Sequence, residues 1–289
     1  MNMSFRLHSV LMFCKFIHFG LWVCSFSIIF AFFKVPQSIV YMKLRKQLAI
    51  AALLPLCLCA TAQNLQLHYD LGHTLNGDLS GRPCVTTTIE MFKPDRWGST
   101  FLFADIDYFH DGVAGVYWEV SRELNVSSNK QWAAHMEYNG GASSSQHTQQ
   151  STRFQHAVLV GPAWNWHSAD YARTLSLQAM YKYYFKGQNP WNQAYSSFQA
   201  TAVWGMQMAR GLCTLSGFLD CWYDPNVDGK WILLSEPQFW VNLNHLRHME
   251  GFNLSLGTEV ELSNNFVWDD KGRNNRFHAI PTLAMKWAF

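Results

Sequence analysis

The sequence lacks the features that mark several common classes of protein. Only 15% of its residues are charged, and its lysines and arginines form no clustered basic face of the kind that nucleic-acid-binding domains carry. No proline-rich or serine-rich linker divides the 227 residues after residue 62, which are enough for one large domain or two small ones. We therefore expect no nucleic-acid partner, and the sequence shows no internal domain boundary.

Cysteines are also few in the part of the chain after residue 62. Of the seven, Cys14, Cys24, Cys57 and Cys59 precede residue 62, and Cys84, Cys213 and Cys221 follow it. The three later ones are an odd number without metal-ligand spacing. Cys213 and Cys221 would lie about 26 Å apart on one extended strand, too far to bridge each other. We expect apolar packing residues, with no disulfide framework, no metal site and no cofactor.

Residues 42–62 have the pattern of an export signal. Met42-Lys-Leu-Arg-Lys46 is basic, Leu48 to Leu58 is apolar, and Cys59-Ala-Thr-Ala62 supplies a small-x-small cleavage site. Leucine, rather than a small residue, precedes both Cys57 and Cys59, which favours cleavage after Ala62 over lipid anchoring. The mature chain, residues 63–289, then keeps 16 of the 22 basic residues and all 20 acidic ones, a net charge of −4.

Residues 1–41 form an apolar prefix in front of this complete signal. One interpretation is a start codon placed too far upstream, with Met42 as the true initiator. The other is a membrane anchor, but the apolar run Leu21 to Phe33 is shorter than the roughly 20 residues of a spanning helix. We favour the upstream start.

From Asn64 onward, stretches of roughly ten residues alternate between apolar and polar side chains, and clusters of turn-forming residues separate them. The first stretch places Leu65, Leu67, Tyr69 and Leu71 between Gln66, His68 and Asp70. After it, strands are predicted near 84–92, 100–109, 115–124, 131–139, 153–164, 173–185, 197–208, 212–223, 231–243, 252–262 and 277–289. The pattern predicts about 12 strands and an all-β fold.

A soluble β-sandwich and a closed antiparallel up-and-down transmembrane β-barrel both fit this alternation. Three features favour the barrel and a bacterial outer-membrane location: the export signal, the aromatic strand at the end of the chain and the 16% aromatic content, with many aromatic residues near strand ends. The longest connections, including Gly140–Thr152, Lys186–Ser196 and Asn264–Arg276, follow odd-numbered strands. The tight ones, such as Ala209–Gly211, follow even-numbered strands. We expect the long connections outside the cell and both chain ends in the periplasm.

The last predicted strand shows the two faces most clearly. Phe277, Ala279, Leu283, Met285, Trp287 and Phe289 occupy one face, and His278, Thr282 and Lys286 occupy the other. We expect the first face to meet the lipids of the outer membrane. The aromatic end at Phe289 is similar to the C-terminal signal read by the barrel assembly machinery, which is a predicted partner. We expect a monomer.

Three segments near the start of the mature chain resemble a known family. They are Glu90-Met-Phe-Lys-Pro-Asp-Arg-Trp-Gly98, Phe101-Leu-Phe-Ala-Asp-Ile-Asp107 and Tyr117-Trp-Glu-Val-Ser-Arg-Glu-Leu124. They resemble the first strands of the Tsx-type nucleoside-specific channel-forming family, including its Bacteroides-type branch. Gly217–Trp222, Ser235–Trp240 and Gly257–Glu261 extend the similarity over nearly all of the mature chain. The resemblance implies a twelve-stranded barrel with a narrow passage for nucleosides.

The predicted inner face carries the candidate site. Glu90, Phe92, Phe101, Phe103, Asp105, Asp107, Tyr117 and Glu119 share inward parity. Further inward ionisable or amide residues are His68, Asp70, His135, Glu137, Asp220, Glu236, Gln238, Glu259, Glu261, His278 and Lys286. An aromatic face stacks on a base by about 1–3 kcal/mol, and carboxylates accept ribose hydroxyls. We expect passive diffusion of small solutes such as nucleosides.

Two other functions stay open at this stage. A barrel enzyme needs a nucleophile and a base within reach of each other. The histidines of His245-Leu-Arg-His248 fall in a predicted turn, and Ser143–Ser145 with His147 fall in a predicted flexible loop, so we expect no catalytic residues and no enzyme. A plugged structural or adhesive barrel is the second alternative, because the loop Gly140–Thr152 could fold inward.

Overall fold

The computed structural model describes residues 63–144, 151–188 and 192–289. All of these belong to one compact unit that spans Ala60–Phe289. The expectations for the prefix 1–41 and the signal peptide 42–62 concern residues outside the described ranges. Among the described residues, no helix combines the length and the apolar character needed to cross a membrane.

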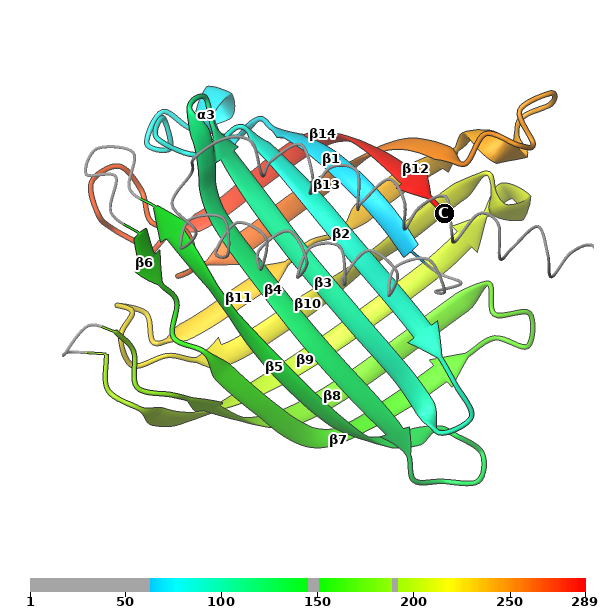
Figure 1. The fold of residues 1–289 in the computed structure, drawn as a ribbon, viewed down its shortest axis with the longest axis horizontal. Coiled ribbons are helices and arrows are strands. Elements are labelled where there is room, and N and C mark those ends of the chain that lie inside the picture. The colour runs from blue at the N-terminus through cyan, green and yellow to red at the C-terminus, as the bar shows by residue number, and fades with distance from the viewer. Residues whose placement is uncertain (1–62, 145–150, 189–191) are drawn as a thin grey trace, which may run out of the picture. The chain divides into compact units, whose positions relative to one another are not determined.

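Strands make up nearly all of the regular structure in this unit (Figure 1). In chain order they are β1 (Gln63–Asp70), β2 (Val85–Pro94), β3 (Gly98–Phe109), β4 (Gly112–Asn125), β5 (Trp132–Ser144), β6 (Ser151–Arg153), β7 (Ala157–His167), β8 (Arg173–Tyr184), β9 (Tyr195–Met208), β10 (Cys213–Tyr223), β11 (Trp231–Ser235), β12 (Gln238–Asn242), β13 (Leu254–Asn264) and β14 (Phe277–Ala288). Short helical turns are α3 (Gly72–Leu75), η1 (Ala209–Gly211) and η2 (Leu243–His245).

The described strands close into a barrel with twelve wall positions. Each strand is antiparallel to its neighbours, and β1 pairs with both β2 and β14. Two positions are each built from two segments: β11 and β12 both lie between β10 and β13, and β6 and β7 both pair with β5. Proline has no amide hydrogen, which accounts for a break at Pro237 between β11 and β12. The predicted closed barrel and its strand count are confirmed.

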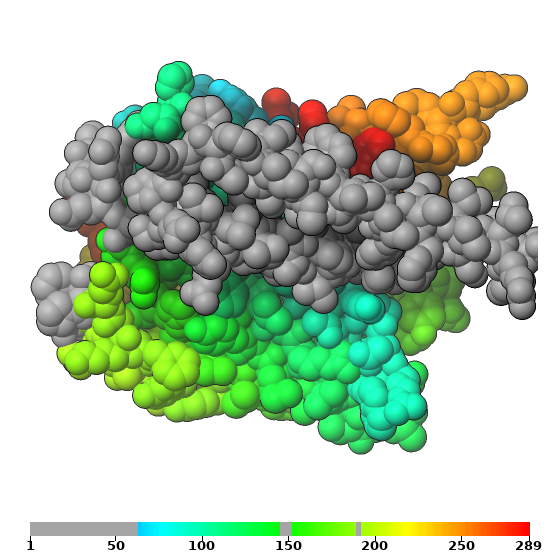
Figure 2. Space-filling view, viewed as in Figure 1, coloured from blue at the N-terminus to red at the C-terminus, as the bar shows by residue number. Residues whose placement is uncertain are grey.

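The closing pair brings both ends of the described unit to the same rim. Leu65 lies opposite Trp287, Tyr69 lies opposite Leu283, and the Phe289 amide donates to the Gln63 carbonyl at 3.0 Å. We call this rim the terminal rim, and the opposite end, which carries α3, the capped rim. The turn 243–253 (orange) projects from the barrel on the side where the C-terminus lies (Figures 1 and 2).

The two faces of the wall are inverted relative to a soluble protein. On β14, Phe277 and Leu283 are 63% and 62% exposed, whereas the alternate residues His278, Ile280 and Thr282 are buried. On β1, Leu65, Leu67 and Tyr69 are exposed, and Gln66, His68 and Asp70 are buried. An apolar outer face, a polar inner face and the absence of an unpaired edge are the requirements of a membrane-spanning barrel. The protein is an outer-membrane barrel.

The predicted loop Gly140–Thr152 begins and ends as strand, which corrects the sequence prediction. Ser143 pairs with Gly115 on β4 and with Thr152 on β6. Ser143 and Ser144 therefore belong to the wall, while Ser145 and His147 lie outside the described residues. The run of small residues looks like a loop in sequence, but small side chains do not prevent backbone pairing with a neighbouring strand. These described residues do not fold into the barrel as a plug.

Connection lengths follow the expected asymmetry with two exceptions, one at each rim. At the capped rim, the segments 71–84 and 265–276 are long, but only His110 and Asp111 join β3 to β4. At the terminal rim, η1 makes a tight turn and 243–253 is the longest connection. His245 lies in η2 on that turn, as predicted. Cys84, Cys213 and Cys221 are free, as expected.

Gly161 on β7 provides a direct test of the wall packing. A Cβ atom at this position would lie 2.1 Å from the carbonyl oxygen of Ala179 and 2.9 Å from the Cα atom of Met180, both on β8. We expect Gly161→Val to lower the free energy of unfolding by about 1–3 kcal/mol, because rigid backbone must move. The measurement is the urea midpoint of the protein in detergent. Gly77→Val is the control, since nothing lies within 4 Å of its Cβ; equal midpoints for the two variants would contradict the assigned packing.

Candidate lumen site and its cap

The eight predicted site residues come together on the inner face of β2, β3 and β4. Glu90 lies opposite Phe103, and Phe103 lies opposite Glu119. Asp105 similarly lies opposite Tyr117. Directly opposed residues of antiparallel strands point to the same face. Their outward neighbours Ile89 and Val120 are exposed, so the site residues face the lumen.

The aromatic residues of the site form a continuous array along β3 and β4. The rings of Phe101 and Phe103 are nearly parallel, with centroids 6.4 Å apart. Tyr117 meets Phe103 edge to face at 6.3 Å. Phe92 pairs with Phe101 at the end of β2 and is 45% exposed. The array therefore runs from the terminal rim into the lumen.

Each predicted carboxylate of the site has a hydrogen-bond donor. The Thr88 hydroxyl donates to Asp105, and the Thr86 hydroxyl donates to Asp107 at 2.6 Å. The Tyr117 hydroxyl donates to Glu119 at 3.3 Å, and the Asn64 amide donates to Glu90 at 3.3 Å. These contacts hold the acids in place. A carboxylate has about four lone-pair positions, so each can still accept bonds from a solute.

Arg82 is the residue of this region that sequence reasoning missed. It lies in the segment 71–84, and its guanidinium donates to Asp70 at 2.7 Å and to Glu261 at 2.6 Å. It also interacts electrostatically with Asp107 and Glu236. Its side chain is 27% exposed. The segment has the composition of a turn-rich loop. Since the alternation of side chains applies only to strands, it could not predict that this cation lies inside the barrel.

Two lysines supply the other cations among the described lumen residues. Lys182 on β8 was not predicted; it donates to Gln199 at 2.8 Å and lies 4.8 Å from the ring centroid of Trp222. Lys286 on β14 was predicted, and its ammonium lies 4.2 Å from the ring centroid of Trp240. Both ammonium groups are held against aromatic faces, which attract cations.

A histidine network lies on another part of the inner face. His135 on β5 contacts Glu123 and Glu137, each at 3.3 Å. Glu123 also accepts a hydrogen bond from Asn165 on β7 at 2.7 Å. The network links β4, β5 and β7 through polar side chains. Among the described residues, no group of histidine, cysteine, aspartate or glutamate side chains is arranged to hold a metal ion.

The lumen is not polar throughout. Leu159, Met180, Trp240 and Ile280 are fully buried, although they share the inward parity of polar residues on their strands. Ile280 packs with Leu79 and Val267, which belong to the two long connections at the capped rim. These apolar side chains narrow the interior. The alternation along the strands correctly predicted which side chains point inward, but it did not predict that apolar side chains fill part of the interior.

The two long connections are joined by charged contacts, and together they form what we call the cap (71–84 and 265–276). The Asp78 carboxylate forms ion pairs with Lys271 at 3.1 Å, with Arg273 at 3.4 Å and with Arg276 at 2.6 Å. Asp270 accepts the Ser80 hydroxyl at 2.6 Å. The hydrogen bond from Lys271 holds the pKa of Asp78 below its usual value. The cap therefore depends on ionised carboxylates.

We expect Arg82→Ala to destabilise the barrel by roughly 3 kcal/mol, because it leaves Asp70 and Glu261 unpaired in a partly desolvated interior. The measurement is the urea midpoint in detergent at pH 7. Adding Glu261→Gln to that variant should recover part of the loss, since one unpaired charge is removed. Arg210→Ala, in the exposed turn η1, is the matched control. No difference between Arg82→Ala and the control would contradict the assigned role.

Acid should loosen the cap. Hydrogen bonds from Arg273 lower the pKa of Asp269 from 3.8 to about 2. A carboxyl whose pKa is lowered by folding contributes stability above pH 3.8 that is lost as the pH falls through about 2. We expect hydrogen exchange of the segment 265–276, corrected for intrinsic rates, to accelerate between pH 5 and pH 2, relative to the turn 243–253. Asp269→Asn should remove much of this dependence, whereas unchanged protection at pH 2 would refute it.

Comparison with solved structures finds several barrels of low sequence identity. The NanC porin is 12% identical, with a TM-score of 0.49, and the match covers 78% of this chain and 99% of that one. The KdgM porin in complex with disordered oligogalacturonate is 9% identical, with a TM-score of 0.43, and the match covers 79% and 99%. LpxR from Salmonella typhimurium is 8% identical, with a TM-score of 0.43, and the match covers 79% and 100%. The barrel assignment itself follows from the strand pairing.

No curated protein matches the chain. One family profile does match, and it extends over residues 62–289, which include every described strand. The chain belongs to the family described as Domain of unknown function (DUF5020).

Proposed function

We propose that this protein is a passive outer-membrane channel for small solutes, with nucleosides as the favoured permeants. The observation that carries the proposal is the array of Phe101, Phe103 and Tyr117 beside the carboxylates of Glu90, Asp105 and Glu119 on one lumen face. Rings and hydrogen-bond acceptors side by side suit a solute that has a flat base and a hydroxyl-bearing sugar.

The size of the barrel supports a narrow passage. A barrel of twelve strands is wider than one of eight, whose interior side chains can fill, and narrower than the 16 to 18 strands of open porins. The buried side chains of Trp240, Met180 and Ile280 narrow it further. A solute would therefore pass in contact with the wall, where the aromatic array can select it.

The charge of the lumen supports neutral or cationic permeants. Acidic side chains on the inner face outnumber the cations Arg82, Lys182 and Lys286, although Arg82 neutralises part of them. An acidic lining lowers the local concentration of anions and raises that of cations. Nucleosides carry no charge near neutral pH, whereas nucleotides would be repelled.

The resemblance to the Tsx-type family, which is nucleoside-specific, supports this choice of permeant. The three segments that carry the resemblance lie on β2, β3 and β4, the strands that carry the array. We further propose that the barrel is a monomer, that it has no enzymatic activity, and that Phe289 is read by the assembly machinery. The signal peptide at 42–62 is part of the same proposal.

A closed structural barrel is the second candidate. Two observations favour it: fully buried apolar side chains lie in the interior, and the cap places Leu79 and Arg82 against inward residues. Such a barrel would span the membrane without conducting. Conductance in planar bilayers separates the two candidates.

Phe103→Ala tests the role of the array. If the channel conducts and adenosine or thymidine blocks it, this variant should weaken the block roughly fivefold to 150-fold, because one stacked base is worth about 1–3 kcal/mol. Asp105→Asn and Asp107→Asn should weaken it as well, through lost acceptors. Phe198→Ala is the control, since Phe198 is exposed on the outer face of β9. Conductance that no nucleoside alters would leave a general small-solute pore, and no conductance would favour the closed barrel.

A further inference from the structure

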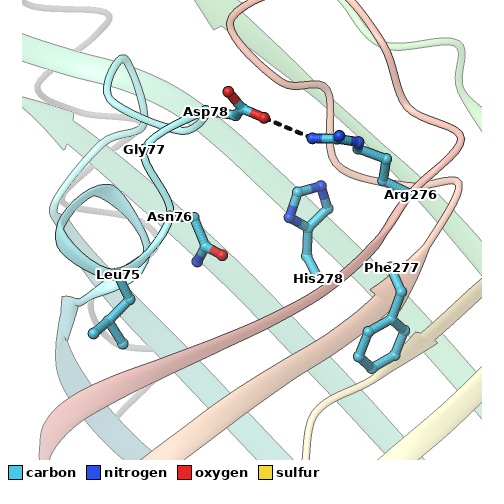
Figure 3. Close-up of a pocket in the computed structure, with 7 residues that line it drawn as sticks. All are labelled: Leu75, Asn76, Gly77, Asp78, Arg276, Phe277 and His278. Atoms are coloured by element: carbon cyan, nitrogen blue, oxygen red, sulfur yellow. Dashed lines mark hydrogen bonds and ion pairs between the residues drawn. The ribbon is translucent and has the colours of Figure 1, made fainter.

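A pocket of about 620 Å³ lies at the capped rim, between the end of α3 and the start of β14. Four polar side chains gather on one side of it (Figure 3): Asn76, Asp78, Arg276 and His278. The side chains of Leu75 and Phe277 point away from these four. Beside Gly77 the space is open, since a Cβ atom there would meet nothing within 4 Å. The pocket is therefore a polar site, distinct from the aromatic array on β3 and β4.

Two polar atoms beside the pocket have unused hydrogen-bonding capacity. Within the described part of the chain, neither His278 Nε2 nor Asn76 Nδ2 has a partner. His278 is only 6% exposed, and its ring is directed into the space between Asn76 and Arg276 (Figure 3). A buried polar atom without a partner is costly. Two of them beside one cavity indicate that a polar group binds between them.

The carboxylates around the pocket are already engaged by cations. In the described structure Arg276 makes its ion pairs through Nη1 alone, with Asp78 at 2.6 Å and with Asp269 at 3.8 Å. Asp78 also pairs with Lys271 and Arg273. Asp269 pairs with Arg273 at 2.7 Å. Three cations thus share two carboxylates, and the Nε and Nη2 edge of the Arg276 guanidinium is left for a ligand.

The groups that remain for a ligand favour an anion. An arginine edge, an amide N–H and an imidazole N–H are donors, whereas a carboxylate or phosphate group offers acceptors, and two of its oxygens match the planar arginine edge. Asp270, the other acid of the segment 265–276, does not line the pocket and accepts the Ser80 hydroxyl instead. The volume lies in the range of about 300–1,000 Å³ that small-molecule sites have, so an organic anion fits better than a bare ion.

We propose that this pocket binds a small organic anion through its carboxylate or phosphate group. Arg276, Asn76 and His278 would donate to that group, and the rest of the molecule would occupy the open side beside Gly77. Because Asn76 belongs to the segment 71–84 and Arg276 to the segment 265–276, the anion would join the two halves of the cap. It would stay there, since the acidic inner face repels anions. The inference does not depend on which solute the lumen passes.

The test uses the mature protein purified in a neutral detergent at pH 7, with glucose 6-phosphate as the probe. Isothermal titration calorimetry gives the Kd, and hydrogen exchange follows the segments 71–84 and 265–276. The probe should bind at one site per barrel. At about ten times the Kd it should slow the exchange of both segments about tenfold, because opening the cap releases the ligand. Glucose, which has the same ring without the charge, should do neither.

Substitutions locate the binding site. Arg276→Gln and, separately, Asn76→Ala should each raise the Kd roughly tenfold or more, the loss of one charge-assisted hydrogen bond. Asn76→Ala retains the contact between Arg276 and Asp78, so it reports on the site even if Arg276→Gln folds poorly. Gly77→Trp should block binding by filling the open side. Arg210→Gln, in η1 at the opposite rim, is the matched control and should leave the Kd unchanged.

Two further anions identify the group that is bound. Gluconate carries a carboxylate in place of the phosphate, and the tighter of the two probes shows which group the pocket takes. Inorganic phosphate should bind more weakly than glucose 6-phosphate; equal affinity would overturn the assignment of an organic ligand. Glucose that binds as well as the anions, no saturable binding of any anion, or an unchanged Kd for Arg276→Gln and Asn76→Ala on folded barrels would overturn the proposal and leave water as the partner of these atoms.

Discussion

The pairing of β1 with β14 is the contact on which the rest of the structure depends. In hydrocarbon, an unpaired strand edge would leave a row of amide and carbonyl groups without partners, each at a cost of several kcal/mol. Closure through the pairs from Asn64 with Ala288 to Asp70 with Thr282 removes that edge. Closure also gives the wall an inside and an outside. Because successive side chains of each strand point to opposite faces, every strand then has one face toward the lumen and one toward the lipid.

Closure creates an electrostatic problem that the long connections solve. Acidic residues such as Asp70, Asp107 and Glu261 all face one interior, where like charges repel one another and desolvation is costly. Arg82 enters from the segment 71–84 and contacts two of these acids directly. The same segment carries Asp78, which contacts three cations of the segment 265–276. The cap and the lumen are therefore one electrostatic unit.

The aromatic array and the charged contacts lie in different parts of the barrel. Phe101, Phe103 and Tyr117 contact one another along β3 and β4, away from the charged cap. In the proposed channel, a solute would meet these rings without disturbing the ion pairs at the capped rim. The apolar residues around Leu159 and Met180 pack on the inner face of β7 and β8 instead. The aromatic array and the apolar packing thus occupy different parts of one inner surface.

The sequence by itself determined the strands, their number, the direction of their faces and the membership of all eight site residues in one inner surface. It did so because alternation has a period of two, and an inward residue such as Glu90 fixes the direction of Phe92 as well. Phe92 nevertheless ends near the rim and is exposed, since its depth depends on where β2 leaves the barrel.

Only the tertiary structure decided the rest. Arg82 and Leu79 lie in a connection, where no periodicity indicates direction, and their burial depends on contacts with Glu261 and Ile280, about two hundred residues away. The sequence did not predict the pairing of Ser143 with Gly115 either. Small residues favour loops unless a neighbouring strand offers hydrogen bonds, and that neighbour is distant in the sequence. Local pattern specifies a wall, while long-range contact specifies what fills and covers it.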